Sequence, residues 1–98
     1  NIKSVKPVIV CVFNKNNIKY YVDILKSLRS AGISAEVYPG EGNLKKQMQY
    51  ANKIDSPAVV LFGENELKSG KATLRNLNSG EETSIKIENL SNEIKKIF

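Results

Sequence analysis

The chain has 98 residues, of which 41% are apolar and 26% charged, so it has room for one hydrophobic core and the composition of an ordinary folded domain. It holds no histidine and one cysteine, which excludes a disulfide within the chain, a Cys/His metal cluster and the common nucleophiles that need an imidazole base. Its net charge is +5 at pH 7, and residues 1–29, with six basic side chains and one acidic, hold all of that excess.

The first predicted element is a strand. Val8 to Phe13 is a continuous run of six apolar residues after Pro7, a pattern typical of a strand buried on both faces. This run is the longest apolar stretch and is far shorter than the roughly 20 residues of a bilayer-spanning helix. No charged-then-apolar leader precedes it. We therefore expect a cytoplasmic chain without a membrane partner.

Helices and strands then alternate. Apolar residues recur at helical spacing in two segments; Gly32 ends the first, and Asn43 stands at the cap position of the second. An alternating segment and a short, wholly apolar one predict two further strands. The expected helices are residues 18–31 and 44–54, and the expected strands are residues 33–38 and 58–62.

After residue 63 the pattern changes. Residues 71–77 and 82–87 predict an antiparallel hairpin around Asn78-Ser79-Gly80, and a short helix follows. Strands joined through helices imply right-handed parallel crossovers, to which the hairpin adds antiparallel strands at one edge. We therefore predict an α/β domain with a five-stranded mixed sheet and three helices.

The ends of the chain suggest how this domain is bounded. The sequence begins at Asn1 and its one methionine is Met48, so we expect it to be cut from a longer protein. Residues 1–6 are expected to be the end of a linker, and residues 7–98 the folded domain.

Basic side chains gather on the first predicted helix. At about 100° per residue, Lys15, Lys19, Lys26 and Arg29 fall within roughly 80° of one another. Such a stripe either contacts phosphates or is simply the solvated side of a half-exposed helix, and both interpretations stay open.

Lys45 and Lys46 fall in the first turn of the second predicted helix. The helix dipole already presents positive charge there, so each lysine costs about 0.3–1 kcal/mol in isolation. Together with the glycine-flanked segment before Asn43, they would form an end that binds anions such as phosphate. The alternative is that a lysine-rich sequence simply tolerates exposed lysines at this position.

Two carboxylates and an arginine form a third candidate site. Glu64 and Glu66 follow the third predicted strand, at the edge where open α/β sheets gather ligands. An ionised carboxylate accepts hydrogen bonds only, which suits the N1–H and N2–H₂ edge of an unpaired guanine or the amino group of a cytosine. Arg75 could stack on a base or fork onto a phosphate, and Tyr38 is a candidate stacking platform. The alternatives are a polar turn with a surface salt bridge, and for Tyr38 a cover for the core edge.

Three segments, from Asn43 to Ile54, from Pro57 to Leu67 and from Gly70 to Glu82, resemble the C-terminal anticodon-binding domain of class II aminoacyl-tRNA synthetases. Within that family the Leu-Lys-Lys-Gln run, the Gly-Glu-x-Glu-Leu turn and the Asn-Ser-Gly-Glu-Glu hairpin are most similar to histidyl-tRNA synthetases. The similarity extends over residues 7–98.

This resemblance implies a domain that binds the anticodon stem-loop of a tRNA, with histidine tRNA as the expected partner. It also implies a parent enzyme, a homodimer whose separate catalytic domain uses ATP and Mg to ligate histidine to its tRNA. No catalytic residue, metal or cofactor is expected in residues 7–98 themselves.

Individual residues match positions of the family pattern. Glu66 and Arg75 match positions that contact anticodon bases in related enzymes, and Gln47, Lys46 and Tyr38 fall where the family places residues near the anticodon loop. We therefore expect base readout by Glu66, Arg75 and Gln47. The expected RNA backbone contacts are Lys45, Lys46, Lys15 and Lys19, and Tyr38 is the stacking candidate.

One departure and two alternative functions remain. Asp55-Ser56 stands where relatives often carry glycine, so we expect a slightly different turn there. A non-catalytic assembly or regulatory domain that keeps this fold for protein contacts would expose an apolar patch. A small-ligand domain would need a deep pocket, and no phosphate-binding fingerprint is complete in the sequence.

Overall fold

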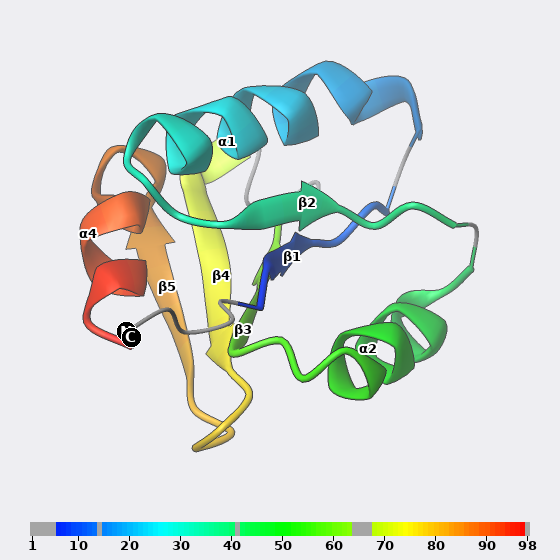
Figure 1. The fold of residues 1–98 in the computed structure, drawn as a ribbon. Helices are drawn as coiled ribbons and strands as arrows, with labels where there is room; N and C mark the ends of the chain where they lie inside the picture. Colours follow the sequence, from blue (N-terminus) through cyan, green and yellow to red (C-terminus); the bar gives the residue numbers. More distant parts are fainter. Residues whose placement is uncertain (1–5, 14, 41, 64–67, 98) are drawn as a thin grey trace.

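The computed structural model describes residues 6–13, 15–40, 42–63 and 68–97. Its elements follow the predicted order, with short 3₁₀ helices at Lys15–Asn17 and Ile87–Asn89 (Figure 1). The strands are β1 (Val8–Val10), β2 (Ala35–Val37), β3 (Ala58–Leu61), β4 (Lys71–Asn76) and β5 (Glu82–Lys86), and the helices are α1 (Ile18–Ser30), α2 (Leu44–Lys53) and α4 (Leu90–Lys95).

The sheet is mixed, in the order β2-β1-β3-β4-β5. β1 pairs in parallel with β2 and β3, because a helix returns the chain to the same edge after each of the first two strands. β4 pairs antiparallel with β3 and β5 through the hairpin. The predicted five-stranded mixed sheet with three helices is confirmed.

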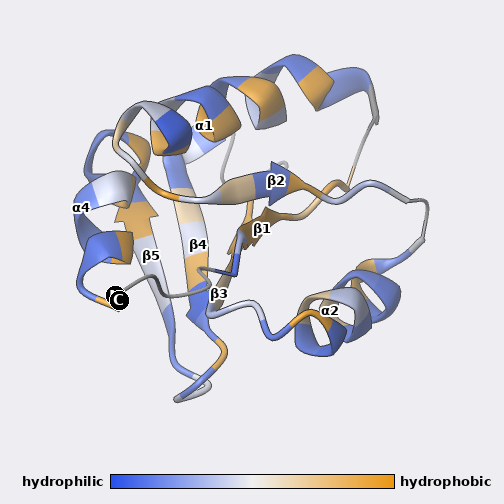
Figure 2. Ribbon diagram, in the orientation of Figure 1, coloured by the Kyte–Doolittle hydropathy of each residue, from blue (hydrophilic) through white to orange (hydrophobic). Residues whose placement is uncertain are grey.

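Helices cover the two faces of the sheet unequally. Tyr21, Ile24 and Leu28 of α1 join Leu90 and Ile94 of α4 in the larger core cluster on one face. α2 packs on the other face, and Figure 2 shows it as mostly hydrophilic. Among the described residues, α2 is the helix on that face, and it is too short to cover all of it.

The centre of the sheet is buried on both faces, as predicted for the first strand. Residues 8–11 have no exposed surface, since alternate side chains enter the clusters under α1 and under α2. Burial raises the pKa of the Cys11 thiol to about 12, which keeps it protonated and unreactive at neutral pH. The strand itself is shorter than predicted, because β1 ends at Val10 rather than at Phe13.

The β4–β5 half of the α2 face is open. Ala72, Leu74 and Ile85 point into the α1 side of the sheet, so the alternate residues of these strands point to the other side. Of these alternate residues, Glu82, Ser84 and Lys86 on β5 are exposed. The described part of the chain therefore leaves a polar sheet surface beside α2 uncovered.

The turn after α2 uses a residue with a positive φ. Asp55 has a φ of 59°, in the left-handed region that favours glycine. Its N–H donates to the carbonyl of Asn52 at 3.1 Å, and the next N–H, of Ser56, donates to the carbonyl of Ala51 at 2.9 Å. This pair of bonds is the Schellman motif, which glycine usually completes.

Replacing Asp55 by glycine should therefore raise the free energy of unfolding. The left-handed conformation and an acidic side chain at a helix C-terminus both disfavour aspartate, so we expect a gain of about 0.5–1 kcal/mol, measured by urea unfolding. Asp55→Asn is the matched control, because it removes the charge but keeps a side chain. A D55G chain no more stable than wild type would contradict this account of the turn.

Candidate functional site

Gln47 ties together three segments at the carboxyl edge of the parallel strands. Its side chain is 1% exposed, and its Oε1 accepts a hydrogen bond from the Val12 N–H at 2.8 Å. Its Nε2 donates to the Val12 carbonyl at 2.6 Å and to the Gly42 carbonyl at 3.2 Å. Both amide hydrogens are thereby used, so a base could reach this amide only after these bonds opened.

Sequence reasoning missed this structural task of Gln47. The residue was matched to a family position near the anticodon loop, and a glutamine in a polar helix is ordinarily exposed. The available signal was its spacing, because Gln47 lies four residues before the buried Ala51, on the same face of α2. Its predicted contact with an anticodon base stays a prediction.

The amino end of α2 has the expected form. The Asn43 side chain accepts from the Lys46 N–H at 3.1 Å, which confirms the predicted cap. The first turn holds no acidic residue, and Lys45 and Lys46 are exposed. Gly42 has a φ of 150°, and a Cβ there would lie 2.8 Å from the Lys46 Cδ, so the chain before the helix requires glycine. Two ammonium groups and the helix dipole thus reinforce one another.

Tyr38 lies beside α2 but is not free. Its ring packs edge-on against Tyr50, with ring centroids 5.5 Å apart, and its N–H donates to the Val10 carbonyl at 3.0 Å. The Tyr50 hydroxyl donates to Glu36 Oε1 at 2.6 Å; this bond, with burial and nearby negative charge, raises the pKa of Tyr50. The half-buried Tyr38 therefore also covers the core edge, the alternative considered above.

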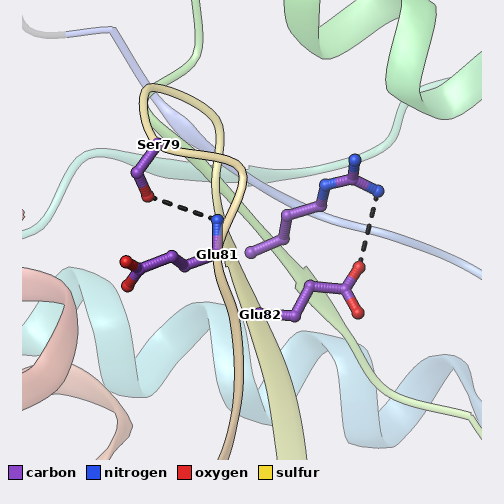
Figure 3. A network of polar contacts seen from close by, with 4 residues as sticks. Ser79, Glu81 and Glu82 are labelled. Carbon is purple, nitrogen blue, oxygen red and sulfur yellow. Dashed lines mark hydrogen bonds and ion pairs between the residues drawn. The ribbon is translucent and has the colours of Figure 1, made fainter.

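Arg75 stands on the open half of the α2 face. It lies opposite Val59 on β3 and Glu82 on β5. Its Nη1 is 3.4 Å from Glu82 Oε2, with the two side chains 41% and 50% exposed. Figure 3 shows Glu82 beside the hairpin turn, where the Glu81 N–H donates to Ser79 Oγ at 3.2 Å. The Arg75 Nε is buried and has no hydrogen-bond partner among the described residues. A long, exposed ion pair stabilises little, so the guanidinium is held loosely.

The basic stripe predicted on α1 is not continuous with Arg75. α1 covers the opposite face of the sheet, and Arg29 uses its Nε to donate to the Ala35 carbonyl at 3.1 Å. Lys15 belongs to the 3₁₀ helix before α1, so the projection at 100° per residue was wrong for it. Lys19 is exposed in the first turn of α1, which starts at the same edge of the sheet as α2.

Glu64 and Glu66 lie outside the described residues. The acidic base reader therefore remains a prediction from the sequence and from the resemblance.

Exposed apolar side chains also lie at the carboxyl edge of the parallel strands. Phe13, Ile18 and Tyr20 are 46–47% exposed and Leu44 is 39% exposed. Phe13 had been assigned to the buried strand, but the chain leaves β1 before it. The Tyr20 ring lies 6.3 Å from that of Phe62, measured between centroids. Aromatic rings at this edge suit either base stacking or a protein contact.

None of the described helices is long and apolar enough to cross a membrane. Within the same residues, no three His, Cys, Asp or Glu side chains gather in a way that could hold a metal ion.

Comparison with known proteins gives a consistent family. Residues 7–97 match the family model described as "Anticodon binding domain". The chain is 46% identical over 98 residues to the histidine–tRNA ligase of Pelagibacter ubique, covering 95% of this chain and 21% of that protein. It is 40% identical over 84 residues to the histidine–tRNA ligase of Bacteroides fragilis, covering 86% of this chain and 18% of that protein.

Solved structures agree with these sequence relatives. The chain superposes on histidyl-tRNA synthetase from Nostoc sp. PCC 7120 with a TM-score of 0.90 and 28% identity, over 95% of this chain and 22% of that one. The chain thus spans about a fifth of the length of the relatives it matches.

Proposed function

Since the chain belongs to the family of anticodon binding domains, we propose that it binds the anticodon stem-loop of a tRNA, and of histidine tRNA in particular. The relatives named histidine–tRNA ligase support the choice of tRNA. In the same proposal, the protein that carries this domain is a homodimer that ligates histidine to its tRNA. ATP and Mg would act there in a separate catalytic domain.

Arg75 is the observation that carries this proposal. Its guanidinium lies on an open sheet face, has one long ion pair at 3.4 Å and keeps an Nε without a partner among the described residues. Such a group can exchange Glu82 for a base edge or a phosphate, to which its planar fork is matched. Glu66, which follows β3 in the sequence, is proposed as the acidic partner in base readout.

In this proposal, lysines supply the part of the RNA affinity that does not depend on the RNA sequence. Lys45 and Lys46 at the amino end of α2 are proposed to contact the RNA backbone, where helix dipole and ammonium charge act together. Lys19 and Lys15, from the same edge of the sheet, would add to this field. Tyr38 is the candidate for stacking, and Gln47 supports the site by holding Val12 and Gly42 in place.

The exposed apolar residues at the carboxyl edge favour one second candidate, a surface for protein contacts. Phe13, Ile18, Tyr20 and Leu44 are the residues concerned. This alternative predicts no salt-dependent affinity for RNA.

A binding titration separates the two functions. We expect the chain to bind a histidine anticodon stem-loop more tightly than the same hairpin with a substituted anticodon. Both affinities should fall as salt rises, because phosphate contacts release counterions. Equal affinity for the two hairpins would contradict base readout. No RNA binding at low salt would favour the protein-contact function.

Lys45→Gln and Lys46→Gln should change RNA binding and fold stability in opposite directions. Each substitution is expected to weaken the binding of both hairpins equally. It should also reduce the slope of log affinity against log salt concentration by about 0.7. Each should also stabilise the fold by about 0.3–1 kcal/mol, because it removes a positive charge from the helix N-terminus. Lys53→Gln, in the last turn of the same helix, is the matched control and should leave RNA affinity unchanged. Unequal effects on the two hairpins would instead make these lysines base readers.

A further inference from the structure

Two lysines lie opposite each other on the hairpin, where their like charges do not stabilise the fold. Lys71 on β4 and Lys86 on β5 are directly opposite partners, and both are exposed. Like charges at opposite positions on adjacent strands destabilise a sheet by about 0.2–1 kcal/mol. Neither lysine forms an ion pair with any residue that the structure describes. The fold would be at least as stable without this pair.

The pair shares its face of the sheet with Arg75. The next residues along each strand, Ala72 and Ile85, are paired with each other and buried on the α1 side. Because side chains alternate along a strand, Lys71 and Lys86 belong to the opposite, open face. Arg75 lies four residues from Lys71 on the same strand and therefore on that same face.

Between the two ends the surface is small and polar. The register places Thr73 opposite Ser84, midway between the Lys71–Lys86 pair and the Arg75–Glu82 pair. The middle of this face thus carries two hydroxyl groups and no bulky side chain on β4 or β5. An elongated polar ligand could lie along the two strands from the lysine pair to Arg75.

The length of this surface fits a strand of nucleic acid. Four residues of β-strand span about 13 Å, at about 3.3 Å per residue. The surface is therefore long enough to follow a short segment of an RNA strand, from a phosphate at one end to a base at the other. Proteins that hold single strands line such grooves with positive charge.

A shallow hollow begins at the lysine pair. It has a volume of about 360 Å³ and is lined by Lys71, Ser84 and Lys86, by Thr83 and Ile85 of β5, and by Asn89 and Glu93, so it reaches round the β5 edge of the sheet toward α4. The Glu93 carboxylate accepts from Lys96 Nζ at 2.9 Å, so its charge is offset by that ammonium. Apart from Glu93 and the apolar Ile85, the lining residues carry ammonium, hydroxyl and amide donors, which can bind a phosphate.

We propose that Lys71 and Lys86 form a phosphate site for the RNA backbone, a short distance along the strand from the base that Arg75 contacts. This inference rests on the proposed function and deepens it by giving the RNA a path across the open face of β4 and β5. The site positions the strand and carries no base information.

The test uses the double variant Lys71→Gln/Lys86→Gln, with the histidine and substituted-anticodon hairpins at several salt concentrations. We expect the slope of log affinity against log salt to fall by about 1.4, and the affinity at about 0.1 M salt to drop roughly 10- to 30-fold. The preference for the histidine hairpin should stay unchanged, and the midpoint of urea unfolding should not fall.

Lys26→Gln/Lys95→Gln is the matched control, because it removes two exposed lysines from the helices on the other face. Its salt slope should stay close to that of wild type. If both double variants lose affinity equally, the effect is net charge alone and the site is overturned. If wild type binds RNA but the Lys71→Gln/Lys86→Gln variant is unaffected, this inference fails and the proposed function stands. A wild-type chain that binds no RNA would overturn both.

Discussion

Replacing Arg75 by glutamine is expected to weaken binding of the histidine anticodon stem-loop by about 10- to 100-fold, since a bidentate arginine contact contributes about 1–3 kcal/mol. If the guanidinium reads a base rather than a phosphate, the same substitution should also lower the preference for the histidine hairpin over the substituted-anticodon hairpin. Stability should change little, because the ion pair that is lost is 3.4 Å long and half exposed. The measurement is the titration described above, run with both hairpins.

Two further variants test whether the planar guanidinium of Arg75 is responsible for this effect. Arg75→Lys keeps the charge but loses the planar fork, so it should keep most of the salt dependence and lose most of the preference. Glu82→Gln removes the carboxylate that now pairs with Arg75, and should strengthen binding of both hairpins modestly by freeing the guanidinium. If Arg75→Gln weakened both hairpins equally, Arg75 would be a backbone contact and the readout would lie elsewhere.

Replacing Gln47 by leucine should cause a large loss of stability. The substitution leaves the Val12 N–H, the Val12 carbonyl and the Gly42 carbonyl without their partner. Each unsatisfied polar group that stays buried costs about 1–3 kcal/mol, and partial access to water lowers the sum, so we expect a loss of about 2–4 kcal/mol in urea unfolding. Gln49→Leu, at an exposed position two residues further along α2, is the control and should have a small effect.

A second substitution separates the hydrogen bonds of Gln47 from its volume. Gln47→Glu keeps an acceptor for the Val12 N–H but loses both donors and places a charge near two carbonyl oxygens. It should be at least as destabilising as Gln47→Leu. A stable Gln47→Glu chain that had lost anticodon preference would restore the base-reading role predicted from the sequence and contradict the structural one.

Much of the fold could be predicted, because buried residues recur in the sequence at the spacing of a helix or a strand. The run from Val8, the helical spacing on α1 and the breaks at Gly32 and Pro57 all reflect packing against one sheet. The end of β1 could not be predicted, because it depends on non-local partners. Beyond Val10 the chain turns its backbone groups at Val12 toward Gln47, 35 residues later, and Phe13 becomes exposed.

The site was predictable where one element determines it. Asn43 and the lysines of the first turn of α2 follow from local helix chemistry, and the structure places them as expected. The pairing of Arg75 with Glu82, the separation of Arg75 from α1 and the burial of Gln47 each depend on which strands are neighbours. Local pattern contains no such information, so these features required the sheet topology.

The uncovered half of the sheet bears on how such a domain can diversify. On β4 and β5 the buried residues Ala72, Leu74 and Ile85 alternate with residues of the open face, so a substitution on that face leaves the core unchanged. Substitutions at Lys71, Thr73, Arg75, Glu82, Ser84 and Lys86 can therefore accumulate without passing through unstable intermediates. The chemistry of this face can therefore change while Ala72, Leu74 and Ile85 keep the scaffold constant.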